Sequence, residues 1–94
     1  MKFPATFTPE EGKIVVRFRD IPEAITQGDN EADAMEMAED VLISSMDFYF
    51  EDQRPVPLPS VPVLGERLVA LPHGLQQQVL AHNKILSTKI DTAI

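Results

Sequence analysis

The side chains that could do chemistry in this 94-residue chain do not form a recognisable catalytic set. His73 and His82 are nine residues apart and do not match the i,i+4 spacing of a helical metal-ligand pair. Glu39 and Asp40 could each ligate magnesium, but neighbouring positions on a helix diverge by about 100° and do not converge on one ion. The four glycines are scattered, so no phosphate-binding loop is predicted. We therefore predict no catalytic, metal-binding or cofactor-binding residues.

Charge is spread unevenly along the chain. Residues 1–60 carry 5 basic and 13 acidic side chains (net −8), residues 61–94 carry 3 basic and 2 acidic (net +1), and the two parts sum to the −7 of the whole chain. Because phosphates repel carboxylates, the acidic part is unsuited to nucleic acid and suited to a basic protein partner. Acidic residues that only keep a domain soluble would give the same composition.

Cysteines and long apolar segments are both absent from the sequence. Without cysteine the chain forms neither a disulfide nor a thiolate metal site. No apolar run approaches the roughly 18 residues that a spanning helix needs. The N-terminus leads into alternating residues and not into the apolar core of a signal peptide. We expect a soluble, cytoplasmic protein without membrane attachment.

Alternating apolar residues predict strands over residues 2–8 and 13–19. The four residues Pro9-Glu10-Glu11-Gly12 have turn chemistry and would join the two strands as an antiparallel hairpin. A short third strand is expected at 24–27, ending before Gly28, and a fourth at 66–71. Together the first three strands predict an antiparallel meander.

Two helices are expected, separated by a stiff proline-rich connector around residues 55–62. Asn30 is a suitable N-cap for the first helix, which should run over residues 31–51 with a wide apolar stripe on one side. The second helix should cover residues 73–86, and residues 87–90 could cap a new helical turn. The element order predicts an α+β domain. We divide it into an acidic N-terminal unit, 1–60, and a segment, 61–94, that contains the fourth strand and the C-terminal helical part.

Short motifs follow one another in a fixed order over about residues 1–72. They are Phe3-Pro4, Glu11-Gly12, the run from Val16 to Pro22, the run from Thr26 to Asp29, and the run from Glu31 to Ala38. FYFED at 48–52 and PLPS at 57–60 come next. As an ordered set, these motifs resemble the N-terminal domain of HicB-type antitoxins.

The resemblance implies a partial RNase H-like fold, β-β-β-α-β, without nuclease activity or cofactor. It implies pairing with a small basic HicA toxin, an mRNA interferase whose active surface the antitoxin covers. It further implies a dimer or tetramer that binds operator DNA and represses transcription. As toxin contacts we predict the outer carboxylates and the aromatic end of the long helix: Glu36, Asp40, Asp47, Phe48, Tyr49 and Glu51.

The C-terminal part departs from the family pattern, in which a helix-turn-helix or a ribbon-helix-helix segment follows. Residues 71–86 resemble the helix that precedes a helix-turn-helix, and residues 87–91 resemble the segment after one, but its body is not visible between them. Alternatively, residues 67–71 form a ribbon and the two following helices complete the motif. As DNA contacts we predict Arg67, Lys84 and Lys89. Self-association through residues 61–94 is expected in either case.

Two other functions are open at this point. One is a degenerate RNase H-like nuclease that would use Asp20, Asp40 and Asp47 with magnesium. The other is an orphan oligomeric adaptor or transcription regulator of the same fold that has no toxin partner.

Overall fold

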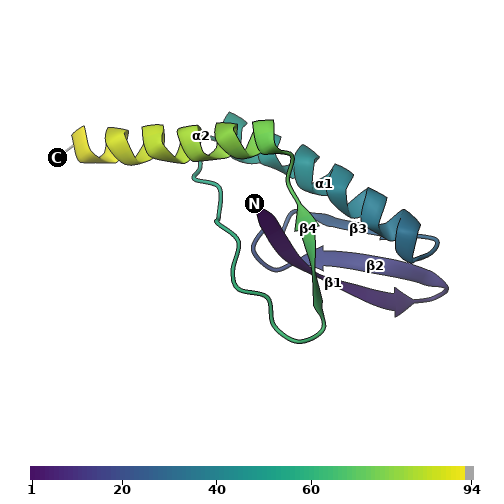
Figure 1. The fold of residues 1–94 in the computed structure, drawn as a ribbon. Helices are drawn as coiled ribbons and strands as arrows, with labels where there is room; N and C mark the ends of the chain where they lie inside the picture. Colours follow the sequence, from purple (N-terminus) through teal and green to yellow (C-terminus); the bar gives the residue numbers. More distant parts are fainter. Residues whose placement is uncertain (93–94) are drawn as a thin grey trace.

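A four-stranded antiparallel sheet with one long helix across a face forms the body of the protein (Figure 1). The computed structural model describes residues 1–92, and the side chains of residues 1–88. The strands are β1 (Lys2–Glu10), β2 (Lys13–Phe18), β3 (Ile25–Gly28) and β4 (Glu66–Ala70), in the spatial order β3-β2-β1-β4. The helices are α1 (Glu31–Glu51) and α2 (His73–Thr92). This arrangement confirms the predicted α+β class.

The β1–β2 hairpin closes more tightly than the sequence predicts. Glu10 pairs with Lys13, so the turn contains only Glu11 and Gly12, and Pro9 lies within β1 opposite Ile14. Both turn residues have positive φ, 49° and 80°, as in the type I′ turns that match the twist of a two-residue hairpin. The predicted four-residue turn was therefore wrong. Pairing with β4 ends at Thr6, so Pro9 lies where β1 is an edge and the missing N–H costs no ladder bond.

Helix α1 begins where the sequence predicts, and its start is fixed by two local contacts. The Asn30 side chain accepts a hydrogen bond from the backbone N–H of Asp33 at 2.9 Å, as an N-cap does. Gly28 lies so close to α1 that an added Cβ would stand 2.3 Å from the backbone nitrogen of Ala34. Only glycine fits this corner, because any side chain would push the helix away from β3.

The core lies between α1 and the sheet. The α1 residues that face the sheet are Ala34, Ala38, Leu42, Ser45, Met46 and Tyr49. From the sheet they meet the apolar sides of β1, β2 and β4, including Phe3, Val16 and Val69. The alternation of β2 is confirmed, since Val16 and Phe18 are buried while Lys13 and Arg17 are exposed.

Helix α2 crosses α1 and then extends beyond the sheet (Figure 1), so that the molecule measures 52 × 24 × 22 Å. Among the described side chains of α2, that of Val79 is fully buried. The prediction that α2 stops at Leu86 was wrong, because the helix continues without a break to Thr92. The Thr88 hydroxyl donates to the Lys84 carbonyl at 2.9 Å, one turn back, so this residue is accommodated inside the helix and does not start a new one.

The predicted division of the chain at residue 60 stays a prediction. β4 lies after that position and pairs with β1 of the same sheet, from Lys2 opposite Ala70 to Thr6 opposite Glu66. Within residues 1–92, no helix is long and apolar enough to cross a membrane.

Candidate protein-binding surfaces

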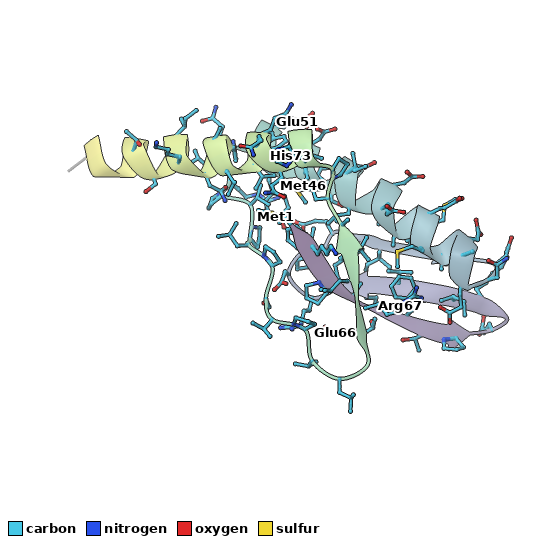
Figure 2. The ribbon with its side chains drawn as sticks, viewed as in Figure 1. Met1, Met46, Glu51, Glu66, Arg67 and His73 are labelled. Carbon is cyan, nitrogen blue, oxygen red and sulfur yellow. The ribbon has the colours of Figure 1, made fainter. Side chains whose placement is uncertain are left out.

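A row of carboxylates follows the side of α1 that faces away from the sheet. Glu36, Asp40, Asp47 and Glu51, which we call the acidic stripe, are all exposed. Their spacing keeps them on one side of a helix with about 3.6 residues per turn. Figure 2 shows oxygen-tipped side chains along the outer side of α1, with Glu51 labelled where α2 crosses it. Among the described residues none of the four takes part in an ion pair.

Apolar side chains border the acidic stripe. Phe48 is 52% exposed, Ile43 38% and Met37 37%. At about 100° per residue, Phe48 and Met37 lie on one flank of the stripe and Ile43 lies on the other. A charged strip with apolar flanks has the mixed character of a protein-binding surface, where apolar contacts give affinity and charge guides the encounter.

The three consecutive aromatic residues at the end of α1 take three different places. Phe48 faces solvent, Tyr49 is only 4% exposed, and Phe50 is half-buried with its ring edge-on to His82 at a centroid distance of 4.9 Å. The expectation that all three cannot be buried is confirmed. Because Tyr49 packs under the helix, it is not placed to touch a partner protein, unlike the other predicted contact residues.

Tyr49 instead anchors a polar cluster below α1. Its hydroxyl donates to Oε1 of Glu23 at 2.5 Å, and the Arg54 guanidinium lies 4.5 Å from the centre of its ring. Burial, followed by the hydrogen bond to Glu23, raises the pKa of Tyr49 to about 12. The same hydrogen bond is the main reason why the pKa of Glu23 is lowered. Both groups therefore keep their usual charge at neutral pH.

The predicted DNA-contact residues do not form one surface among the described residues. Arg67 donates to Glu31 at 2.6 Å and covers the Phe7 ring at 4.4 Å, so its charge is already paired. Lys84 is exposed on α2, about 16 Å along the helix from its start at His73. The side chain of Lys89 lies outside the described residues.

The proposed nuclease triad is also not assembled. Asp20 accepts hydrogen bonds from the backbone N–H of Ser60 at 2.8 Å and from its hydroxyl at 2.6 Å. Asp40 and Asp47 are exposed on α1. In the part of the chain that the structure describes, no group of three or more His, Cys, Asp or Glu side chains is placed to hold a metal ion.

A second surface lies on the connector and β4, and we call Val61, Val63, Leu64 and Leu68 the apolar edge patch. Their exposed fractions are 84%, 62%, 103% and 44%. In the sequence-based prediction, Val61 lies in the connector, Leu68 in the fourth strand and all four residues in the segment expected to self-associate, but they are not singled out as an exposed surface. The signal was present in VPVLG, an uncharged apolar run in an otherwise acidic chain.

The connector is held in place by an ion pair between Arg19, which is partly exposed, and Glu66, whose side chain is covered. Arg19 donates to both carboxylate oxygens of Glu66, at 2.8 and 3.0 Å, and to the carbonyl oxygen of Val61 at 2.6 Å. Glu66 also accepts from the backbone N–H of Val63 at 2.8 Å. The hydrogen bond from Arg19, followed by that from Val63, lowers the pKa of Glu66. This network gives the apolar edge patch a defined conformation.

Comparison with known proteins places this chain in one family. Residues 2–80 match the model of the HicB-like antitoxin of bacterial toxin-antitoxin systems. The chain is 44% identical over 91 residues to Antitoxin HicB of Escherichia coli K12, covering 96% of this chain and 66% of that protein. It is 47% identical over 91 residues to Antitoxin HicB 1 of Photorhabdus laumondii, covering 96% of this chain and 57% of the relative. Antitoxin HicB 2 of the same organism is 42% identical over 93 residues, covering 99% and 66%.

The chain spans about two thirds or less of the length of these relatives. The family match nevertheless covers the whole sheet, α1 and the first part of α2. The resemblance seen in the ordered sequence motifs is thereby confirmed, and the chain belongs to the HicB-like antitoxin family of bacterial toxin-antitoxin systems.

Proposed function

We propose that this protein is an antitoxin that binds a small basic HicA-type toxin and covers its RNA-cleaving surface in the cytoplasm. The observation that carries the proposal is the acidic stripe with its apolar flanks. A toxin that cleaves mRNA must attract phosphates, so its active surface must be basic. The role is one of binding and not of catalysis.

The stripe suits this partner because its charges are not used inside the protein. Among the described residues, other carboxylates form six ion pairs with the five side chains Lys13, Arg17, Arg19, Arg54 and Arg67. Glu36, Asp40, Asp47 and Glu51 stand outside these pairs and span about 22 Å along α1. A row of free carboxylates of this length can compete with an RNA backbone for a basic surface and can speed up the encounter.

The direct test uses the small basic protein encoded next to this gene. We expect equimolar antitoxin to stop RNA cleavage by that protein, and the complex to weaken as salt is raised, because exposed charges are screened. Asp47→Lys and Phe48→Ala should each weaken the complex by about tenfold or more, as changes at central interface residues do. Cleavage that continues unchanged in the presence of excess wild-type protein would refute the proposal.

A matched control is available in the β1–β2 turn. Glu11 is exposed and lies on the hairpin rather than on α1, so Glu11→Lys makes the same charge change at a distance from the stripe. It should leave the affinity for the toxin close to that of the wild type. Equal losses for Glu11→Lys and Asp47→Lys would mean that net charge, and not the stripe, controls binding.

Repression of the operon by a DNA-binding oligomer is the second part of the proposal. It is supported by the family and by the exposed Lys84 on α2, with Lys89 further along the same helix. Binding to the promoter fragment upstream of the gene should fall when both lysines are changed to Glu. The alternative, an orphan regulator without a toxin, would be favoured if no small basic reading frame lay beside the gene.

A further inference from the structure

β4 is an edge strand whose outer side has no partner strand within the described residues. The sheet order places β1 on one side of β4 and nothing on the other. The backbone N–H of Leu71 donates to the Met1 carbonyl at 2.9 Å, which fixes the alternation of the β1–β4 ladder. In an antiparallel ladder the inward-bonding and outward-facing residues alternate. The N–H and C=O groups of Leu68 and Ala70 therefore point away from the sheet.

This edge has little of the protection that natural edge strands usually carry. Edges are commonly blocked by charges, prolines, bulges or a covering segment. Here Glu66 is neutralised by Arg19, Arg67 is bound to Glu31 on the α1 side of the sheet, and the outward positions hold Leu68 and Ala70. The preceding residues of the apolar edge patch, Val61, Val63 and Leu64, add exposed aliphatic surface beside the strand.

We propose that the β4 edge and the apolar edge patch bind a second copy of this chain, through antiparallel pairing of the two β4 strands about Leu68. The pairing would join the two four-stranded sheets into one continuous sheet. The proposal rests on the proposed function and specifies the self-association that this function assigns to an oligomer. Its sedimentation and cross-linking tests use neither toxin nor DNA, so either proposal can fail alone.

Charge and register both favour a second copy as the occupant. Pairing about Leu68 sets Leu68 opposite its symmetry mate, Arg67 opposite Val69 and Glu66 opposite Ala70, so no like charges face each other across the strands. A chain with a net charge of −7 repels its own copies over most of its surface. The uncharged patch is where two copies approach with the least repulsion.

The same register also covers the rest of the patch. In an antiparallel pair, the residues before β4 in one copy lie beside the residues after β4 in the other. In the register centred on Leu68, Leu64 would therefore lie beside Pro72 and Val63 beside His73 of the second copy. The other edge strand, β3, is only four residues long and ends at Gly28, where α1 begins, so it offers a shorter and more crowded edge.

Sedimentation of the protein over a range of concentrations tests the proposal. We expect the wild type to have twice the chain mass of 10.5 kDa, and Leu68→Glu to weaken the dimer by about 30-fold or more, as the loss of a central interface residue does. Ile25→Glu, on the opposite edge and 55% exposed, is the matched control and should leave the dimer intact. Ile85→Glu should do the same, since Ile85 lies on α2 and is 56% exposed.

Cross-linking gives a second readout that does not depend on the affinity of a variant. The chain has no cysteine, so Leu68→Cys introduces a single thiol. Directly opposed residues of an antiparallel pair have Cβ atoms about 5 Å apart, within reach of a short bis-maleimide. Leu68→Cys should cross-link efficiently and Ile25→Cys should not.

Three outcomes would overturn the proposal. The first is a wild type that stays monomeric up to millimolar concentration. The second is a dimer that survives Leu68→Glu, or that is lost in Ile85→Glu instead, which would assign the contact to α2. The third is a chain that is monomeric alone but binds the toxin in a Leu68-dependent way, which would assign the edge to the toxin.

Discussion

The hydroxyl of Tyr49 lies at the border of the core. Its hydrogen bond to Glu23 links the segment before β3 to the end of α1. Tyr49→Phe keeps the ring and the Arg54 contact but removes this bond of 2.5 Å. Glu23 remains partly solvated, with 32% of its side chain exposed, so the loss should be modest. We expect the free energy of unfolding to fall by about 1 kcal/mol, measured by urea titration.

Glu23→Gln provides the companion variant for this bond. It keeps an oxygen that can accept from the Tyr49 hydroxyl but removes the negative charge. It should therefore be less destabilising than Tyr49→Phe if the hydrogen bond matters more than the charge. Tyr49→Phe with wild-type stability would show that water replaces the Tyr49 hydroxyl as the partner of Glu23.

At the scale of elements, α2 is tied to the connector by Asn83, and His82 Nε2 lies 2.7 Å from the Arg54 carbonyl oxygen just before it. Asn83 accepts from the backbone N–H of Val56 at 2.7 Å and donates to its carbonyl at 2.9 Å, as a neighbouring strand would. Val56 is buried, so its backbone groups have no ready substitute partner in water. Asn83→Ala should cost about 1–3 kcal/mol. It should also raise the hydrogen-exchange rate of the Val56 amide more than that of amides in β2.

Asn83→Asp separates the two halves of this contact. The carboxylate still accepts from the Val56 N–H but offers no donor to its carbonyl. Its effect on the exchange of the Val56 amide should be smaller than that of Asn83→Ala. If Asn83→Ala leaves this amide as protected as in the wild type, α2 is held mainly by Val79 and Leu75, not by Asn83.

The Arg19–Glu66 ion pair, which holds the connector against the sheet, should make the stability of the protein depend on pH. The Glu66 carboxyl has a pKa below its ordinary value of 4.5 because of Arg19 and the Val63 amide. A carboxyl with a lowered pKa binds fewer protons in the folded than in the unfolded chain. Its contribution is therefore fully present above about pH 4.5 and is lost as the pH falls through the folded value. Between neutral and acid pH, the melting temperature of Glu66→Gln should fall less than that of the wild type.

A double variant tests whether Arg19 is responsible. If the pair acts as one unit, Arg19→Gln combined with Glu66→Gln should follow the pH dependence of Glu66→Gln alone. Additive effects of the two changes on the acid side would contradict this assignment, since each residue would then stabilise the fold through separate contacts.

The sequence could predict the elements that are determined within their own segment, but not the features that depend on contacts with distant parts of the chain. Asn30 and the apolar spacing of α1 define that helix within its own segment, and the alternation in β2 does the same for a strand. The Glu11-Gly12 turn was missed because its tightness depends on Pro9 lying beyond the end of β4, which only the sheet order shows. Likewise, Ser87 and Thr88 favour a helix end in isolation, but here the helix continues through them.

The candidate surfaces divide in the same way. The exposed carboxylates of the acidic stripe follow from helical periodicity, so Glu36, Asp40, Asp47 and Glu51 could be identified before the fold was known. The apolar spacing of α1 likewise places Tyr49 on its buried side, but the partner of its hydroxyl, Glu23, is 26 residues away and no local pattern identifies it. The edge patch depends on β4 pairing with β1, a contact about 60 residues apart in the chain that no local pattern reports.

At the scale of the whole molecule, charge and apolar surface are separated. The acidic stripe lies on the outer side of α1, whereas Leu68 points to the sheet face opposite α1, because its neighbours Arg67 and Val69 face the helix and the core. One copy could therefore meet a basic partner through α1 while its β4 edge pairs with a second copy. Binding of a toxin and self-association would then be additive events that do not compete.

The separation also predicts that the acidic stripe limits the stability of the free protein. Glu36 and Asp40 are like charges at i,i+4 spacing, an arrangement that destabilises a helix by a few tenths of a kcal/mol. Asp40→Lys replaces this repulsion with a Glu-to-Lys pair in the favourable direction, so the free energy of unfolding should rise by about 0.5 kcal/mol. The same variant should bind the toxin about tenfold less tightly, because a lysine then faces a basic surface. Calorimetric titration with the toxin and urea unfolding of the same sample give both quantities. If Asp40→Lys lowered both the stability and the affinity for the toxin, Asp40 would be needed for the fold, and a functional role for the stripe would be contradicted. A rise in stability together with a fall in affinity is what a surface maintained for a partner produces.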